Sequence, residues 1–207
     1  MESVEEVAEE LLETFNSQVL PRLGEISDEG KRFLYFIAWL NSEAERRGLG
    51  RIIITGGFAI EIYTARAYRT MDVDLIVEGR ALYIVKEFLR RFSEAIGRGF
   101  LPRYEVLQLK SIDIVSSTYG RRVEPTKIIV NGFTVYVEPI EELLIIYLVG
   151  WKFWGATEDR DKAIWLYMVQ KGRINEKYLE ERAREEGVSD YLEKIRELTS
   201  TTPQQST

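Results

Sequence analysis

Hydrophobic residues recur at helical spacing near both ends of the chain and in short strand-like runs between them. Over residues 4–15 and 33–44, apolar side chains stand three and four positions apart, and this spacing predicts two amphipathic N-terminal helices. The last residues, 200–207, are small or polar, and we expect a disordered tail there. Helical spacing returns after residue 139 in four segments separated by glycines: 140–154, 159–170, 175–186 and 189–198.

The middle of the chain has the patterns typical of β-strands. The expected strands cover residues 51–55, 72–77, 103–109, 111–116, 127–130 and 133–137. Asn131-Gly132, between the last two strands, predicts a hairpin turn because both residues tolerate a positive φ. Helical spacing lies between strands over 58–66 and 80–96. These elements predict an α+β fold, in which a mixed sheet of about five strands is flanked by helices.

This order of elements predicts three structural parts and a tail. Residues 1–48 form N-terminal helices that pack on the core, residues 49–138 form the domain that contains the sheet, and residues 139–199 form a helical region. With 207 residues, of which 45% are hydrophobic, the chain is long enough to bury one substantial core with a small helical companion.

The composition excludes several kinds of chemistry. The chain has no Cys and no His, which rules out disulfides, thiolate nucleophiles, Cys-based zinc sites and histidine bases. A bound metal would be a hard cation held by oxygen, which favours Mg²⁺ or Mn²⁺. The apolar run 140–154 is too short and too charged to span a bilayer, and the N-terminus is acidic where a signal peptide is basic. We therefore expect a cytoplasmic protein.

Charge is unevenly distributed along the chain. The formal net charge is −6, from 28 Lys and Arg and 34 Asp and Glu. Residues 66–131 hold 12 of the basic and 8 of the acidic residues, which leaves 16 and 26 for the flanks. An anionic ligand would therefore meet its most favourable field over the middle segment.

Three short motifs in the middle of the chain carry the candidate chemistry. Thr55-Gly56-Gly57 ends an aliphatic strand and precedes a helix, so that backbone amides can approach a polyphosphate at a helix N-terminus. Asp72 and Asp74 stand two residues apart on an expected strand, point to the same side and would repel each other unless a cation lay between them. Asp113, which has aliphatic neighbours on the expected strand 111–116, can reach the same metal from an adjacent strand.

The stretch from Gly56-Gly57 to Asp72-Val73-Asp74 resembles the active-site motif of the DNA polymerase beta-like nucleotidyltransferase superfamily. In that family a Gly-Gly or Gly-Ser turn precedes an Asp-x-Asp/Glu pair, and a third carboxylate follows on a later strand. The sequence is most similar to the minimal and abortive-infection toxin branches, over residues 50–170. Fourteen residues separate Gly57 from Asp72, slightly more than is usual in the family.

The resemblance implies a nucleotidyltransferase fold and metal-dependent transfer of a nucleoside monophosphate from an NTP to a hydroxyl of an acceptor. The toxin branch further implies that the acceptor is tRNA or a protein and that an antitoxin is the partner. The implied metal ligands and catalytic residues are Asp72, Asp74 and Asp113, which would hold Mg²⁺ or Mn²⁺. The expected nucleotide-binding residues are Thr55, Gly56, Gly57, Arg69, Thr70, Lys152 and Asp161.

Other interpretations of these residues stay open. Lys152 lies in an apolar helix, where its stem would extend along the core, and Asp161 would pair with a neighbouring basic residue on a helix surface. Arg69 and Thr70 would be ordinary loop residues. At the level of function, the alternatives are a nucleotide-binding or scaffold protein of the same fold without turnover, and a transferase that modifies an aminoglycoside-type antibiotic.

Overall fold

The computed structural model describes residues 2–200, and these residues divide into two compact units. The sheet unit comprises residues 2–58 and 70–137, and the helical unit comprises residues 59–69 and 138–200. Helix α4 (Gly56–Tyr63) begins in the sheet unit and continues into the helical unit. From residue 201 onward, the expected disordered tail lies outside the described residues.

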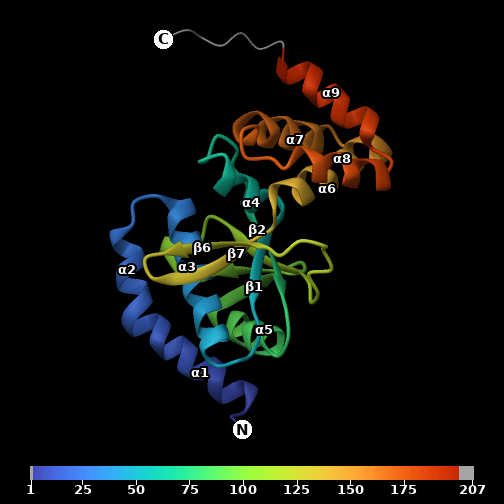
Figure 1. Ribbon diagram of the computed structural model, residues 1–207. Helices are drawn as coiled ribbons and strands as arrows, with labels where there is room; N and C mark the ends of the chain where they lie inside the picture. Colours follow the sequence, from blue (N-terminus) through green and yellow to red (C-terminus); the bar gives the residue numbers. More distant parts are fainter. Residues whose placement is uncertain (1, 201–207) are drawn as a thin grey trace. The chain divides into compact units, whose positions relative to one another are not determined.

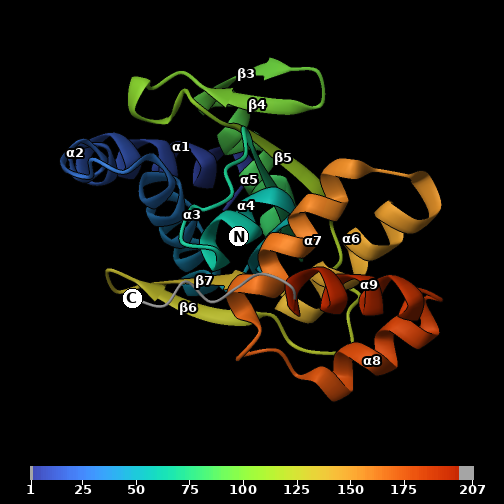
Figure 2. The same cartoon turned by 90° about the horizontal axis from the view of Figure 1, so that it is seen from above.

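One mixed sheet of seven strands forms the centre of the sheet unit in the part of the chain that is described. Its strands are β1 (Ile52–Thr55), β2 (Asp72–Val77), β3 (Ser93–Ile96), β4 (Gly99–Pro102), β5 (Ser111–Ser116), β6 (Thr126–Val130) and β7 (Phe133–Val137). Their spatial order is β3-β4-β5-β2-β1-β7-β6. Strand β2 is parallel to β5 and β1 is parallel to β7, whereas the other neighbours are antiparallel. The β3–β4 and β6–β7 hairpins therefore lie at opposite margins of the sheet (Figure 2).

The α+β class and the mixed sheet are confirmed, but the sheet has seven strands rather than about five. The difference arises where a helix was expected over residues 80–96. Helix α5 (Ala81–Phe92) ends earlier, and the chain then forms the β3–β4 hairpin. Gly97, with a φ of +58°, allows this reversal because a residue without a Cβ adopts a positive φ at little cost.

The strand expected over residues 103–109 is wrong. The chain there forms a short 3₁₀ helix, η2 (Glu105–Leu107). Leu107 is fully buried, and Tyr104, three residues earlier, packs its ring against Phe92 at a centroid distance of 4.9 Å. Two side chains three residues apart that both pack on the core fit a helical turn, whereas a strand would place them on opposite faces.

From residue 2 onward, four helical segments precede the first strand. They are α1 (Val4–Thr14), the π-helical turn η1 (Phe15–Val19), α2 (Leu20–Glu25) and α3 (Glu29–Arg46). Ser3 and Glu6 form a capping box at the start of α1, and the Asp28 carboxylate caps α3 by accepting a hydrogen bond of 2.8 Å from the Lys31 backbone N–H. The apolar spacing predicts α1 and α3 but misses η1 and α2, because a π turn inserts an extra residue and shifts that spacing.

Aromatic side chains join the N-terminal helices to the rest of the sheet unit. The Phe15 ring lies 5.7 Å from the ring of Phe36 on α3, 4.8 Å from that of Phe92 on α5 and 4.8 Å from that of Tyr104, measured between centroids. These distances are in the range of favourable edge-to-face contacts. Helices α1, α3 and α5 therefore share one core (Figure 1).

The two faces of the sheet have different surroundings. Val73, Leu75 and Val77 of β2 share one face and are fully buried, as are their β1 neighbours Ile52 and Ile54. Helices α3 and α5 pack against β1, β2 and β7 and cover this face. The alternate residues of β2 include two aspartates, so the opposite face is the polar one.

The helical unit contains α6 (Ile140–Trp154), α7 (Thr157–Gln170), α8 (Glu176–Glu185) and α9 (Ser189–Ser200). Gly155, with a φ of +65°, ends α6 in the left-handed conformation that glycine favours. The buried Glu142 carboxylate accepts hydrogen bonds from the Tyr178 hydroxyl and, at 3.3 Å, from the Arg182 guanidinium. Among the helices that the structure describes, none has the length and apolar character needed to cross a membrane.

Truncating Phe15 tests whether this ring holds the N-terminal helices on the core. We expect Phe15→Ala to lower the free energy of unfolding by about 3–5 kcal/mol, the usual cost of deleting a fully buried aromatic ring. Urea denaturation measures the change. Tyr83→Ala is the control, since the Tyr83 side chain on α5 is 63% exposed, and its effect should stay within about 0.5 kcal/mol. Equal effects from the two variants would contradict this role.

Candidate active site

Strand β2 carries two carboxylates on one face. Asp72 and Asp74 alternate with Val73 and Leu75, whose side chains are fully buried on the helix-covered face. Successive side chains of a strand point to opposite faces, so the two aspartates share the polar face. Asp72 is exposed and Asp74 is partly buried.

The register of the neighbouring strands extends this acidic face into a row. Asp74 is the direct partner of Thr55 on β1 and of Asp113 on β5, while Asp72 is the partner of Ser111. Side chains of directly paired residues lie on the same face of a sheet. Thr55, Asp74 and Asp113 therefore stand side by side on three strands, with about 4.8 Å between neighbouring strands.

A pocket of about 570 Å³ opens over this row. Asp72, Asp74 and Asp113 line it. Ser111 of β5 and three residues of the β3–β4 hairpin, Ile96, Arg98 and Gly99, also contribute to the lining. The structure thus brings the three aspartates that the sequence singles out into one pocket of the sheet unit.

The turn between β1 and α4 packs directly against Asp74. Gly56 has a φ of +61°, and a Cβ at this position would lie 2.0 Å from Oδ2 of Asp74. A Cβ on Gly57 would lie 2.9 Å from Oγ1 of Thr70. Both positions leave no room for a side chain, and Gly56 also needs a backbone conformation that other residues rarely adopt. The turn therefore holds the first backbone N–H groups of α4 next to a carboxylate of the row.

The carboxylates of the pocket repel one another. Burial raises the pKa of the Asp113 carboxyl above its ordinary value of 3.8, and the negative charge of Asp72 raises it further. Asp72 itself accepts a hydrogen bond of 2.7 Å from the Ser111 hydroxyl. A cation bound in the pocket would relieve this repulsion.

The donor set fits a hard divalent cation, because it consists of carboxylate oxygens on one face of a sheet. As they stand, no three acidic side chains within residues 2–200 converge closely enough to hold one ion. Binding would therefore involve rotation of the aspartate side chains within the pocket. The assignment of Asp72, Asp74 and Asp113 as metal ligands stays a prediction.

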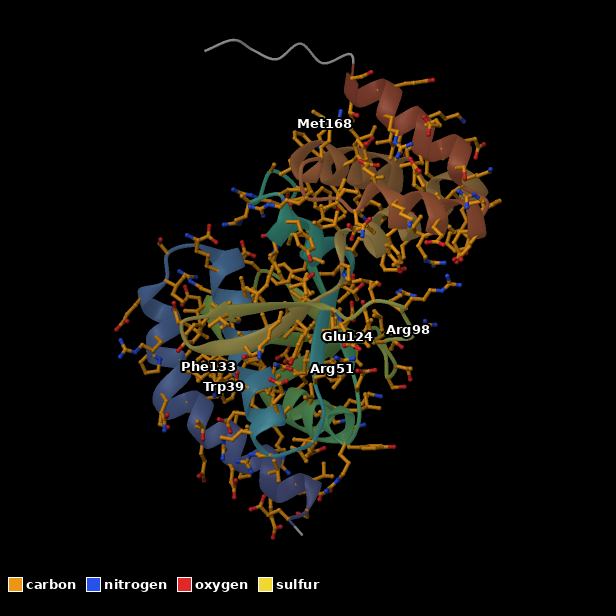
Figure 3. All side chains as sticks on the ribbon, viewed as in Figure 1. Trp39, Arg51, Arg98, Glu124, Phe133 and Met168 are labelled. Atoms are coloured by element: carbon orange, nitrogen blue, oxygen red, sulfur yellow. The ribbon has the colours of Figure 1, made fainter. Side chains whose placement is uncertain are left out.

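The remainder of the polar face is covered by the segment that follows β5. The ring of Tyr119 is buried on the aliphatic residues of β1 and β2, and its backbone N–H donates to the Glu78 carboxylate at 2.9 Å. Arg51 bridges Glu78 and Glu124 with ion pairs of 2.7 Å each, and Arg51 and Glu124 lie side by side in Figure 3. These contacts confine the open part of this face to the region around the aspartates.

Two residues next to the site were not singled out from the sequence, although they directly precede Ile112-Asp113. Ser111 donates a hydrogen bond to Asp72. Lys110 is only 2% exposed, donates to the backbone carbonyl of Thr70 and has its ammonium 5.6 Å from the centre of the Phe58 ring. Lys110 therefore fixes the strand-entry segment that leads to Asp72.

Arg98 and Gly99 were not singled out from the sequence either. Arg98 lines the aspartate pocket from the turn of the β3–β4 hairpin. A Cβ on Gly99 would lie 2.2 Å from Oδ1 of Asp113, so the hairpin packs closely on that carboxylate. The Gly97-Arg98-Gly99 sequence was the available signal, but it directly follows the helix expected over residues 80–96 and was assigned to no element.

The remaining predicted nucleotide-binding residues lie in different places. Thr55 ends β1 within the row, and Thr70 lies before β2, where its Oγ1 accepts from the Asp72 backbone N–H at 3.3 Å. Arg69 is exposed, in the segment between α4 and β2 that belongs to the helical unit.

Lys152 and Asp161 also belong to the helical unit. The Lys152 ammonium donates to the Asp190 carboxylate at 2.6 Å and to the Gly187 carbonyl at 2.7 Å. Asp161 accepts a hydrogen bond of 2.9 Å from Arg160 on the surface of α7. Both side chains therefore have local partners, and their part in nucleotide binding stays a prediction.

Comparison with solved structures identifies the class of fold. The chain is similar to the crystal structure of an antigenic nucleotidyltransferase-like protein from Paracoccidioides brasiliensis, with a TM-score of 0.50 and 19% identity over 68% of this chain and 76% of that chain. The mixed sheet with its flanking helices is therefore a nucleotidyltransferase-like fold.

Two structures of the antibiotic-resistance factor ANT(2'')-Ia also match. Its solution structure has a TM-score of 0.47 and 18% identity over 81% of this chain and 96% of that chain. Its crystal structure with adenylyl-2"-tobramycin has a TM-score of 0.48 and 17% identity over 77% and 97%. No protein-family model and no curated protein matches the sequence.

Replacing Gly56 tests the packing of the turn on Asp74. We expect Gly56→Ala to destabilise the protein by at least about 1–2 kcal/mol, because Ala disfavours a φ of +61° and its Cβ would collide with the Asp74 carboxylate. Gly120→Ala is the matched control, since no atom lies within 4 Å of a Cβ built there. Denaturant titration compares the two variants, and a Gly56→Ala protein as stable as the control would show that the turn is not constrained.

The raised pKa of Asp113 predicts a pH-dependent effect of Asp113→Asn. A carboxyl whose pKa is higher in the native state than in the unfolded chain lowers stability when ionised, and this cost disappears as the pH falls below 3.8. Without divalent ions, Asp113→Asn should raise the melting temperature at pH 7, and the gain should shrink as the pH falls toward 4.

Thermal unfolding between pH 4 and pH 7 measures this difference. Glu94→Gln, which neutralises an exposed carboxylate of the same unit, serves as the control and should leave the melting temperature almost unchanged. A melting temperature that falls at pH 7 in Asp113→Asn would show that the Asp113 charge is already compensated in the native protein.

Proposed function

We propose that the protein is a metal-dependent nucleotidyltransferase that moves a nucleoside monophosphate from an NTP to a hydroxyl of an acceptor. The observation that carries this proposal is the pocket lined by three aspartates, one of which packs against the Gly56-Gly57 turn, on the polar face of a nucleotidyltransferase-like sheet. Carboxylates in this arrangement suit Mg²⁺ or Mn²⁺, and backbone N–H groups at a helix start suit phosphate.

In this proposal Asp72, Asp74 and Asp113 would hold the metal. When bound, divalent ions would neutralise the triphosphate and lower the pKa of the acceptor hydroxyl. The Gly56-Gly57 backbone would orient the phosphates for in-line attack. The acceptor oxygen forms a bond to the α-phosphorus, the bond from that phosphorus to the bridging oxygen breaks, and pyrophosphate leaves. Asp113 accepts the hydroxyl proton.

Further nucleotide contacts are assigned to residues around this centre. Thr55 and Thr70 flank the Gly56-Gly57 turn, and Arg69 supplies a cation for the triphosphate. Lys152 would reach a phosphate only after releasing Asp190 and the Gly187 carbonyl, and Asp161 would act from α7.

We further propose that the protein acts in the cytoplasm as the toxin of a toxin-antitoxin pair, with tRNA or a protein as the acceptor. The support for this assignment is the sequence resemblance of residues 50–170 to the abortive-infection branch. A cognate antitoxin would then be its partner.

Transfer of label from an α-labelled NTP tests the proposed activity. The wild-type protein is incubated with Mg²⁺, each labelled NTP in turn and a cell extract, and the labelled fraction is identified. We expect Asp74→Asn and Asp72→Asn to lower the transfer by at least about 100-fold, because each removes a metal ligand. Circular dichroism verifies that the variants keep the fold.

Glu94→Gln controls for the loss of one negative charge in the same unit and should keep full transfer. Undiminished transfer by Asp74→Asn would contradict the assignment of the metal site. Metal-dependent NTP binding by the wild type without transfer to any fraction would instead favour a nucleotide-binding protein without turnover.

A further inference from the structure

The aspartate pocket has a second charged feature that the proposed function does not use. Besides the three aspartates, Arg98 is the only charged residue among the described residues that line it. No hydrogen bond or ion pair joins the Arg98 side chain to another residue within the described chain. Two apolar side chains on the same lining are largely exposed, Ile96 at 53% and Val115 at 56%.

The backbone of the β3–β4 hairpin fixes Arg98 beside Asp113. Ile96 pairs with Gly99, so Gly97 and Arg98 form a two-residue turn in which only Gly97 has a positive φ. Gly99 then packs against the Asp113 carboxylate, where any side chain would collide. The Arg98 side chain leaves the turn at the margin of the sheet (Figure 3).

Arg98 and the Gly56-Gly57 turn lie at opposite ends of the row of aspartates. The strand order places β4, β5, β2 and β1 side by side, with Gly99 on β4 against Asp113 and Gly56 after β1 against Asp74. Three strand spacings, about 14 Å, separate β4 from β1. The row of aspartates therefore has one anion-binding feature on each side: the N–H groups at the start of α4 next to Asp74, on the β1 side, and the Arg98 guanidinium in the pocket, on the β4 side.

We propose that Arg98 binds a backbone phosphate of an RNA acceptor, next to the ribose hydroxyl that receives the nucleotide. This inference rests on the proposed function, which places the NTP phosphates at the Gly56-Gly57 turn and leaves the β4 side of the pocket for the acceptor. The exposed side chains of Ile96 and Val115 supply an apolar surface for the sugar and base beside that phosphate.

The charges of the pocket favour an anionic acceptor over a polycationic one. A polycationic antibiotic would need carboxylates beyond those that hold the metal, and the lining formed by residues 2–200 contains none. A guanidinium at the acceptor end would repel such a ligand, whereas it matches the geometry of a phosphate. The excess of basic residues over positions 66–131 also favours an anionic acceptor.

Binding of a fluorescein-labelled, twelve-nucleotide single-stranded RNA, followed by anisotropy in Mg²⁺ without NTP, tests the role of Arg98. We expect Arg98→Ala to weaken RNA binding about tenfold, as for loss of one charge-assisted hydrogen bond. The slope of log affinity against log salt should fall by about 0.7, the value for one lost phosphate contact on a single strand. Arg98→Lys should recover part of the affinity.

Arg103→Ala is the matched control. Arg103 is an exposed arginine just after β4 that faces Glu94 at 3.9 Å and does not line the pocket, so its loss should change RNA affinity by less than about twofold. Equal losses in the two variants would show a diffuse charge effect and overturn the proposal. An unchanged RNA affinity and salt slope in Arg98→Ala would overturn it as well.

A fluorescent aminoglycoside provides the opposite probe. The proposal would be overturned if the wild-type protein bound no RNA and the Arg98→Ala variant bound this polycation more tightly than the wild type. The acceptor would then be a polycation and not an RNA. The proposed function is tested separately by Mg²⁺-dependent binding of a non-hydrolysable NTP to the wild type and to Asp74→Asn. Lack of that binding would refute the proposed function whatever the RNA result.

Discussion

The register between β1, β2 and β5 is the constraint on which the candidate site depends. Antiparallel pairing sets Thr55 beside Asp74, and parallel pairing sets Asp74 beside Asp113, so residues distant in sequence meet in one row. A slip of one residue in either pairing would turn a carboxylate toward the helix-covered face, where burial of its charge would be costly. The buried face therefore enforces the geometry of the polar one.

Glycines set how closely the surrounding backbone approaches this row. Gly56 brings the start of α4 against Asp74, and Gly99 brings the β3–β4 hairpin against Asp113, in both cases where a Cβ would lie within 2.2 Å of a carboxylate oxygen. The carboxylates are thus enclosed from both sides by backbone rather than by side chains. This arrangement leaves N–H groups next to Asp74 at one end of the row and the Arg98 side chain beyond Asp113 at the other.

The sequence predicted the α+β class and the elements around the aspartates because their signals are local. Asp72 and Asp74 follow strand periodicity, and Gly56-Gly57 marks a strand-to-helix turn. The hairpin that carries Arg98 was missed for two reasons. Apolar residues continue at helical spacing after Phe92, where α5 ends, and β4 becomes recognisable as a strand only through its pairing with β5. Lys110 was missed because burial of a lysine depends on tertiary contacts that no local pattern encodes.

A crystal structure with Mn²⁺ and a non-hydrolysable NTP, using anomalous scattering to locate the metal, tests the central claim most directly. The account predicts Mn²⁺ bound by the carboxylates of Asp72, Asp74 and Asp113, with the triphosphate on the Gly56-Gly57 turn. Nucleotide bound elsewhere on the sheet unit, or Mn²⁺ absent from these carboxylates at saturating concentration, would contradict it.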